Sequence, residues 1–177
     1  MTHLLVVTDF QHDFIDGSLG FPKARELEGP IVEKILKYRA AGDEVIFTLD
    51  THFSNYLDTQ EGKKLPVIHC VKGTAGHDLY GKIAEMVLPA DKIFEKHAFP
   101  APQIFEYLKT RTYDSIEFVG LVSSICVLSN AILAKAAAPE TEIIVDAACT
   151  SAFDESLNEK ALDIMENLQI TIINRKL

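Results

Sequence analysis

Three side chains in this 177-residue chain could together cleave an amide bond: the thiol of Cys126, the ammonium of Lys96 and the carboxylate of Asp9. A cysteine thiolate is a strong nucleophile, and a carboxylate can take the thiol proton and return it to a departing amine. Cys126 ends the segment 120–126, which reads as a turn into a helix, so helix N–H groups and Lys96 should lower the pKa of the thiol. The three residues predict a cysteine hydrolase; taken singly, a buried cysteine, a solvated lysine and a turn aspartate are the ordinary alternatives.

A second group of side chains could bind a divalent metal ion. Asp50 and His52 are separated by one residue, so in an extended segment both project to the same side. His69, together with Glu61 or Asp58, could complete the ligand set, because imidazole nitrogens and carboxylate oxygens bind zinc and related metals. Exposed loop histidines that bind no metal are the alternative interpretation.

The elements that must position these residues alternate between short apolar runs and longer amphipathic stretches. Runs of β-branched and aliphatic residues predict six strands, at 3–8, 44–49, 92–94, 115–119, 142–145 and 170–173. Apolar residues that return every three or four positions predict helices at 31–41, 78–88, 101–110, 124–138 and 155–168. Segment 51–76 fits neither period, and we expect a long loop of the kind that carries function.

The strand runs are almost wholly apolar, which is typical of a parallel sheet covered by helices on both faces. The predicted fold is therefore α/β, a three-layer α/β/α sandwich with a six-stranded parallel sheet, forming a single domain over residues 1–177. Ligands of such sheets bind beyond the carboxyl ends of the strands. The candidate catalytic residues and the Asp50-Thr51-His52 segment all follow predicted strands, so we expect them to meet at one edge of the sheet.

Composition and charge exclude several classes of protein. The chain is 47% hydrophobic and 24% charged, which is typical of a globular domain and excludes disordered and collagen-like chains. Its 17 basic and 26 acidic residues give a net charge of -9, which would repel nucleic acid. The apolar N-terminal run stops at Asp9 and has no basic leader, so we expect neither a signal peptide nor a membrane span, and a cytoplasmic location. The three cysteines, Cys70, Cys126 and Cys149, are an odd number and should be free thiols.

Five separated segments carry a resemblance to a known family. They are Asp9-Phe10-Gln11-His12-Asp13-Phe14, with the pattern D-x-Q-x-D-F, then Asp50-Thr51-His52, 69–76, Phe94-Glu95-Lys96 and 120–126. Together they resemble the nicotinamidase/pyrazinamidase family of the isochorismatase-like cysteine hydrolase superfamily, over nearly the whole chain. The resemblance implies an isochorismatase-like, Rossmann-like fold in which Cys126 is the nucleophile, Asp9 the general base and acid, and Lys96 the cation beside the thiolate.

The resemblance also implies how the substrate is held. A cis peptide bond between Leu121 and Val122 would let the backbone N–H groups of Val122 and Cys126 form the oxyanion hole, whose donors are each worth about 3 kcal/mol. The apolar walls of the pocket would come from Phe14, Phe99, Val122 and Ile125. The chain departs from the family at 97–102, where a Ser-x-Phe pattern is usual, and at Val122, where alanine or threonine is common.

A metal ion that anchors the substrate is a further implication of the resemblance. Asp50, His52 and His69 would hold zinc, with manganese and iron as alternatives, because the same ligands suit all three metals. The chain lacks the additional loop histidine of many members. For the remaining position we favour Glu61, with Asp58 and water as the alternatives.

The expected activity is hydrolysis of nicotinamide to nicotinate and ammonia through a cysteine thioester, in NAD salvage. One alternative is a cysteine hydrolase of the same superfamily that acts on another small amide or ureido compound; action on a vinyl ether, as in isochorismatases, does not need the metal ligands. Another is an inactive binding domain, for which the unusual Phe99–Pro102 segment and the missing loop histidine are the main arguments. The expected partner is a small amide, without nucleic acid or membrane, and the chain could form a homo-oligomer.

Overall fold

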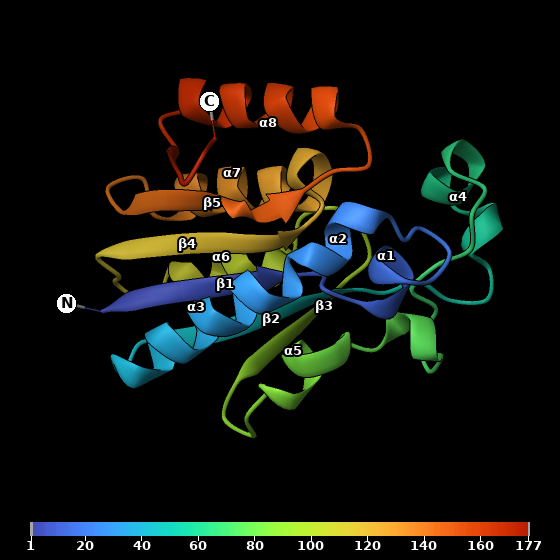
Figure 1. Ribbon diagram of the computed structural model, residues 1–177, viewed down its shortest axis with the longest axis horizontal. Coiled ribbons are helices and arrows are strands. Elements are labelled where there is room, and N and C mark those ends of the chain that lie inside the picture. Colours follow the sequence, from blue (N-terminus) through green and yellow to red (C-terminus); the bar gives the residue numbers. More distant parts are fainter. Residues whose placement is uncertain (1, 177) are drawn as a thin grey trace.

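The chain folds around a six-stranded sheet with the strand order β3-β2-β1-β4-β5-β6 in the computed structural model, which describes residues 2–176 (Figure 1). Every neighbouring pair of strands is parallel. The strands are β1 (His3–Thr8), β2 (Glu44–Asp50), β3 (Lys92–Lys96), β4 (Ser115–Leu121), β5 (Glu142–Ser151) and β6 (Thr171–Ile173). All six predicted strands are present, and β2 to β5 continue beyond the predicted runs because the residues that follow still pair with a neighbouring strand.

Helices cover both faces of the sheet, which confirms the three-layer α/β/α fold (Figure 1). Leu5 and Val7 of β1 face one layer, and Leu4 and Val6 face the other. The first layer holds α1 (His12–Ile15), α2 (Pro22–Glu26), α3 (Glu28–Ala40) and α5 (Gly81–Glu85). The second holds α6 (Pro102–Leu108), α7 (Leu128–Ala137) and α8 (Glu155–Asn167).

Segment 51–76, predicted as a loop, contains two short helical pieces, and a third, the 3-10 turn Ala75–His77, begins at its end. A 3-10 turn spans Tyr56–Asp58, and α4 spans Gln60–Lys64. The sequence did not indicate α1, α2 or α4, because helices of four or five residues are too short to complete a hydrophobic period. Between residues 2 and 176 no helix has the length and apolar character needed to cross a membrane.

The carboxyl ends of four adjacent strands carry the candidate site. Asp9 follows β1, Asp50 ends β2 and Lys96 ends β3, while the turn leading to Cys126 follows β4. At Gly120 in β4, φ is +104° and an added Cβ would lie 2.0 Å from the carbonyl oxygen of Thr8. Only glycine therefore allows β4 to approach β1 so closely at this point.

Candidate active site

Lys96 brings the three candidate catalytic side chains together. Its Nζ lies 2.8 Å from Oδ2 of Asp9 and 3.4 Å from Sγ of Cys126. A third partner is Oδ1 of Asp50, at 3.0 Å. All four side chains are buried, so the ammonium interacts with its partners without competition from bulk water.

The carboxylate of Asp9 is held at the end of β1 by the neighbouring strand β2. Its backbone has a φ of +46°, in the left-handed region that few aspartates adopt. Thr48 Oγ1 donates a hydrogen bond of 2.6 Å to Oδ1 of Asp9, and the Asp9 N–H donates to the Thr48 carbonyl oxygen. Oδ2 is thereby directed at Lys96, and nothing in the sequence marked Thr48 for this task.

Burial is the largest single influence on the pKa values of Asp9, Lys96 and Cys126. Removal from water raises the pKa of the Cys126 thiol well above its usual value, although the charge of Lys96 opposes the shift. Burial likewise raises the pKa of Asp9 against the opposing charge of Lys96. Burial alone would lower the pKa of Lys96, but its acidic neighbours outweigh it and raise that pKa. The expectation of a lowered thiol pKa was wrong, because desolvation exceeds the effect of the nearby cation.

Cys126 lies in a π-helical turn, Ser123–Val127, and the regular helix α7 begins only at Leu128. The Leu121–Val122 peptide bond that precedes the turn is cis, where the family resemblance places one. Asn130 fixes the turn from α7, since its Nδ2 donates to the Cys126 carbonyl oxygen at 2.9 Å. Asn130 is fully buried but lies inside a helix, where sequence reasoning did not look for a supporting residue.

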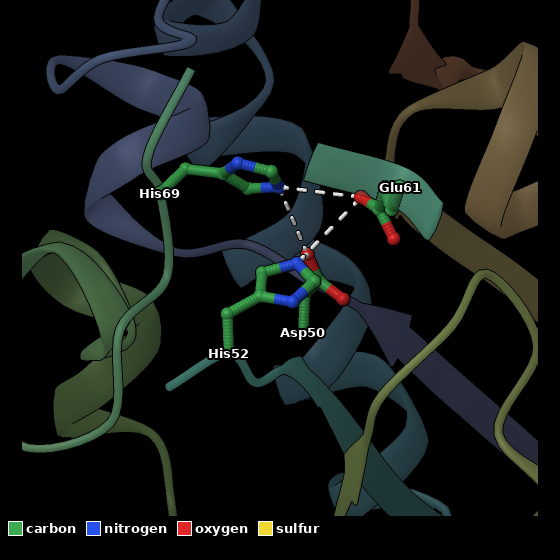
Figure 2. Close-up of side chains that lie close together, drawn as sticks. All are labelled: Asp50, His52, Glu61 and His69. Carbon is green, nitrogen blue, oxygen red and sulfur yellow. Dashed lines mark hydrogen bonds and ion pairs between the residues drawn. The ribbon is translucent and has the colours of Figure 1, made fainter. Parts of the chain in front are cut away.

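Beside Lys96, four side chains could hold a divalent metal ion. Figure 2 shows Asp50, His52, Glu61 and His69 directed toward one another, and one ligand atom from each lies within 4.8 Å of the others. Oδ2 of Asp50 lies 3.0 Å from Nε2 of His52 and 3.3 Å from Nε2 of His69. Oε1 of Glu61 lies 3.6 Å and 3.7 Å from the same two nitrogens. Asp58 is exposed in the preceding turn and does not belong to this group.

The donor set fits a divalent metal. Nδ1 of His69 bonds the Val67 carbonyl oxygen at 2.8 Å, which leaves Nε2 facing the two carboxylates, as metal-binding histidines are typically oriented. Burial would raise the pKa of Asp50, but hydrogen bonds from both histidines and the charge of Lys96 hold it well below its usual range. Two imidazoles and two carboxylates are ligands that zinc, manganese and iron all accept.

A cavity of about 470 Å³ adjoins His52 and Glu61. Phe99 belongs to its lining, whereas the other three predicted pocket residues, Phe14, Val122 and Ile125, do not. Phe14 packs edge-on against His69, with ring centroids 5.7 Å apart, and so lies beneath the metal ligands. The lining instead includes aromatic residues that the sequence did not indicate: Phe53, Tyr56 and His97.

The family described as Isochorismatase domain matches residues 3–176. The chain belongs to this family. Within it, the chain is 25% identical over 214 aligned residues to the nicotinamidase of Saccharomyces cerevisiae, covering 97% of this chain and 99% of the yeast protein.

Solved structures of isochorismatase-family hydrolases share the fold. The pyrazinamidase/nicotinamidase of Streptococcus mutans superposes with a TM-score of 0.86 at 27% identity, covering 97% of this chain and all of that one. The N-carbamoylsarcosine amidase of Thermoplasma acidophilum superposes with a TM-score of 0.81 at 26% identity, covering 97% and 95% of the two chains. Both relatives are amidases, and nicotinamidases recur among the relatives of this chain.

Proposed function

We propose that this protein is a nicotinamidase, which hydrolyses nicotinamide to nicotinate and ammonia. The observation that carries the proposal is the buried contact of Lys96 with both Asp9 and Cys126, next to a group of metal-ligand type. The similarity to the nicotinamidases of yeast and Streptococcus mutans supports the choice of substrate.

The first half of the reaction forms a thioester. Asp9 accepts the proton of the Cys126 thiol as sulfur attacks the carboxamide carbon, and Lys96 stabilises the negative charge on sulfur. The backbone N–H groups of Val122 and Cys126 are the proposed oxyanion hole for the carbonyl oxygen. Asp9 then gives its proton to the amide nitrogen, the C–N bond breaks and ammonia leaves. The raised pKa of Asp9 suits this role, since the residue must hold a proton between the two transfers.

The second half hydrolyses the thioester. A water molecule loses a proton to Asp9 as its oxygen attacks the thioester carbon. The C–S bond breaks, nicotinic acid forms and Asp9 returns the proton to the sulfur of Cys126. The raised pKa of the thiol favours this last step, because the buried cysteine is more stable as a neutral thiol than as a thiolate.

We assign the metal site to Asp50, His52, Glu61 and His69, and propose zinc as the ion. When bound, the ion supplies a Lewis acid for the ring nitrogen of the substrate. The chain's own contribution is rigidity: His52, Tyr56 and His69 pack their rings against one another, with centroids 4.5 to 5.0 Å apart. The hydroxyl of Tyr56 also donates to the Leu65 carbonyl oxygen at 2.9 Å. This bond holds the segment that connects Glu61 to His69.

Ammonia release from nicotinamide by the wild type and by Cys126→Ala tests the proposal. Removal of the nucleophile should lower the rate on the order of 1,000-fold or more, because the remaining binding groups give little turnover alone. Cys149→Ala is the matched control, since this thiol is also buried but packs in the core on the α3 side of the sheet. Wild-type turnover no faster than that of Cys126→Ala would contradict hydrolysis of nicotinamide by this site.

A second candidate substrate is a small ureido compound. The similarity to N-carbamoylsarcosine amidase favours it, and Lys64 and His97 at the cavity could face the carboxylate of such a substrate. Comparison of ammonia release from nicotinamide, pyrazinamide and N-carbamoylsarcosine by the same enzyme separates the candidates. A preference for N-carbamoylsarcosine in kcat/KM would replace nicotinamide as the assigned substrate.

We place the activity in pyridine nucleotide salvage in the cytoplasm. The three cysteines are free and buried, which agrees with a reducing compartment. The assigned partner is the small amide substrate, and a homo-oligomer stays a prediction.

A further inference from the structure

Gln11 and Asp13 follow the catalytic Asp9 at alternate positions, yet neither contacts Cys126 or Lys96 in the reaction proposed above. Gln11 is fully buried between the ends of β1 and β2. Asp13 lies in α1, against the segment that leads away from His69. A buried amide and a partly buried carboxylate are costly unless they are fully hydrogen-bonded, so their partners indicate what they do.

Gln11 forms hydrogen bonds with both backbone polar groups of Asp50. Its Oε1 accepts a hydrogen bond of 2.8 Å from the Asp50 N–H, and its Nε2 donates to the Asp50 carbonyl oxygen at 2.9 Å. The second hydrogen on Nε2 is donated to the His77 carbonyl oxygen at 2.8 Å. Gln11 thus fixes the orientation of the residue whose carboxylate faces both histidine ligands.

Asp13 holds the peptide unit next to His69. Its Oδ2 accepts a hydrogen bond of 2.7 Å from the Cys70 N–H, which belongs to the peptide bond between His69 and Cys70. Cys70 has a φ of +46°, a left-handed conformation that a residue with a side chain keeps only when its surroundings hold it there. The Cys70 carbonyl oxygen in turn accepts from the His52 N–H at 2.9 Å. Asp13 therefore holds the peptide unit between His69 and Cys70, and it also acts on His52 through the Cys70 carbonyl oxygen.

Gly76 leaves room for this carboxylate. A Cβ added at Gly76 would lie 2.1 Å from Oδ2 of Asp13, and its three nearest atoms all belong to the Asp13 side chain. A methyl group at this position would have to displace the carboxylate from the Cys70 N–H.

We propose that Gln11 and Asp13 are positioning residues for the metal ligands, Gln11 for Asp50 and Asp13 for His69. The inference rests on the metal site of the proposed function. The D-x-Q-x-D motif then has one task at each polar position: proton transfer at Asp9, and alignment of two metal ligands at Gln11 and Asp13.

Zinc affinity, measured by competition with a chromophoric chelator, tests both assignments. Asp13→Ala and Gln11→Leu should each weaken zinc binding about 10- to 100-fold, the range found when a residue supporting a metal ligand is removed. Asp13→Asn should lose less, because its amide oxygen can still accept from the Cys70 N–H. Asp16→Ala is the matched control, since Asp16 follows α1, is exposed and bonds only to His12 among the side chains.

Two further measurements separate positioning from general damage. The visible spectrum of the Co²⁺-loaded protein should change in Asp13→Ala and Gln11→Leu but not in Asp16→Ala, because it reports ligand geometry. Alkylation of Cys126 by iodoacetamide should proceed at the wild-type rate in Asp13→Ala and Asp16→Ala, since Asp13 bonds the segment beside His69 and not Asp50, the ligand that also contacts Lys96.

Gly76→Ala gives a second route to the same conclusion. It should weaken zinc binding in the wild-type background and have little effect in the Asp13→Ala background, where the displaced carboxylate is already absent. Wild-type zinc affinity and Co²⁺ spectrum in Asp13→Ala or Gln11→Leu would overturn the assignment of that residue. A wild-type protein that binds neither Zn²⁺ nor Co²⁺ would instead overturn the metal site itself.

Discussion

At the scale of single residues, Asp50 couples the two halves of the site. Its Oδ1 accepts from Lys96 at 3.0 Å, while its Oδ2 faces the nitrogens of His52 and His69. One carboxylate therefore contacts both the cation beside the nucleophile and the group of metal-ligand type. A change in charge on the metal side is transmitted to Lys96 through a side chain that is itself buried.

The glutamate ligand can be tested against the aspartate that the sequence offered as its alternative. Glu61→Gln should weaken zinc binding about 10-fold or more, because a neutral amide is a poorer ligand than a carboxylate. Asp58→Asn should leave the affinity unchanged, since Asp58 points to solvent from the preceding turn. Isothermal titration with zinc measures both variants. Equal losses, or a loss confined to Asp58→Asn, would contradict the assigned ligand set.

The sequence pointed to the three side chains that the structure brings together at Lys96, but to few of the residues that support them. Asp9, Lys96 and Cys126 could be predicted because each stands just beyond an apolar run, where a parallel sheet gathers its ligands. Thr48 and Asn130 lie inside a strand and a helix, and their contacts depend on which elements become neighbours in three dimensions. The sign of the pKa shift at Cys126 could not be predicted either, because it depends on complete burial.

At the scale of elements, the short helix α4 is the part of the site that has the least support from the sheet. It carries Glu61 and projects beyond the carboxyl ends of the strands (Figure 1). Thr59 caps its N-terminus, since Oγ1 accepts from the Gly62 N–H at 3.0 Å and donates to the Tyr56 carbonyl oxygen at 2.7 Å. An added Cβ at Gly62 would lie 2.1 Å from that same carbonyl, so the helix packs directly on the preceding turn.

Loss of the Thr59 cap should therefore weaken zinc binding at the proposed metal site. Thr59→Ala should destabilise α4 by about 1 kcal/mol, the usual cost of removing an N-cap side chain. Amide hydrogen exchange within α4 should become faster, and zinc should bind several-fold more weakly because Glu61 is less well ordered. Thr110→Ala is the control, because Thr110 is an exposed threonine beyond the end of α6 that also donates to a backbone carbonyl oxygen, that of Tyr107. Unchanged exchange in α4 would contradict the capping role.

The elements themselves differ in how far the sequence predicts them. Near-continuous apolar runs identified every strand, because strands buried on both faces leave an unambiguous pattern. The start of the helix after β4 could not be located, since the π-helical turn at Ser123–Val127 departs from the helical period. The 78–88 prediction overestimated α5, which spans only Gly81–Glu85 and continues as irregular backbone.

At the scale of the whole molecule, a second buried ionic group joins the α3 layer to the sheet. Lys34 of α3 pairs with Glu117 of β4, and its Nζ lies 2.6 Å from Oδ2 of Asp146 in β5. The Tyr38 hydroxyl also donates to Glu117, at 2.6 Å. This group lies away from the candidate active site and has no place in the proposed reaction.

Removal of its cation should destabilise the fold. Lys34→Met leaves two buried carboxylates without their partner, which should cost about 3 kcal/mol in the free energy of unfolding. The acidic neighbours raise the pKa of Lys34 above its ordinary 10.5, against the opposing effect of burial. A raised folded-state pKa gives stability that is complete below pH 10.5 and is lost as the pH rises through the folded value.

Urea unfolding of the wild type and Lys34→Met across the pH range measures this contribution. As the pH is raised from neutral, the difference between them should stay constant up to about pH 10.5 and shrink above it. Lys37→Met, at an exposed lysine of the same helix, should unfold like the wild type. A difference that already shrinks near neutral pH would contradict the ionic role of Lys34.

The order of the strands has a consequence for folding of the chain during its synthesis. β1 lies between β2 and β4, so a growing chain completes β1, β2 and β3 before the nucleophile-bearing segment after β4 exists. Until then, one edge of β1 is unpaired, and Asp9 and Lys96 lack Cys126 as a neighbour. Such a half-sheet offers an unpaired apolar edge, the surface at which incomplete chains associate. Docking of β4 closes this edge of β1 and brings the segment with Cys126 beside Asp9 and Lys96. The open edge then moves to β4 until β5 pairs with it.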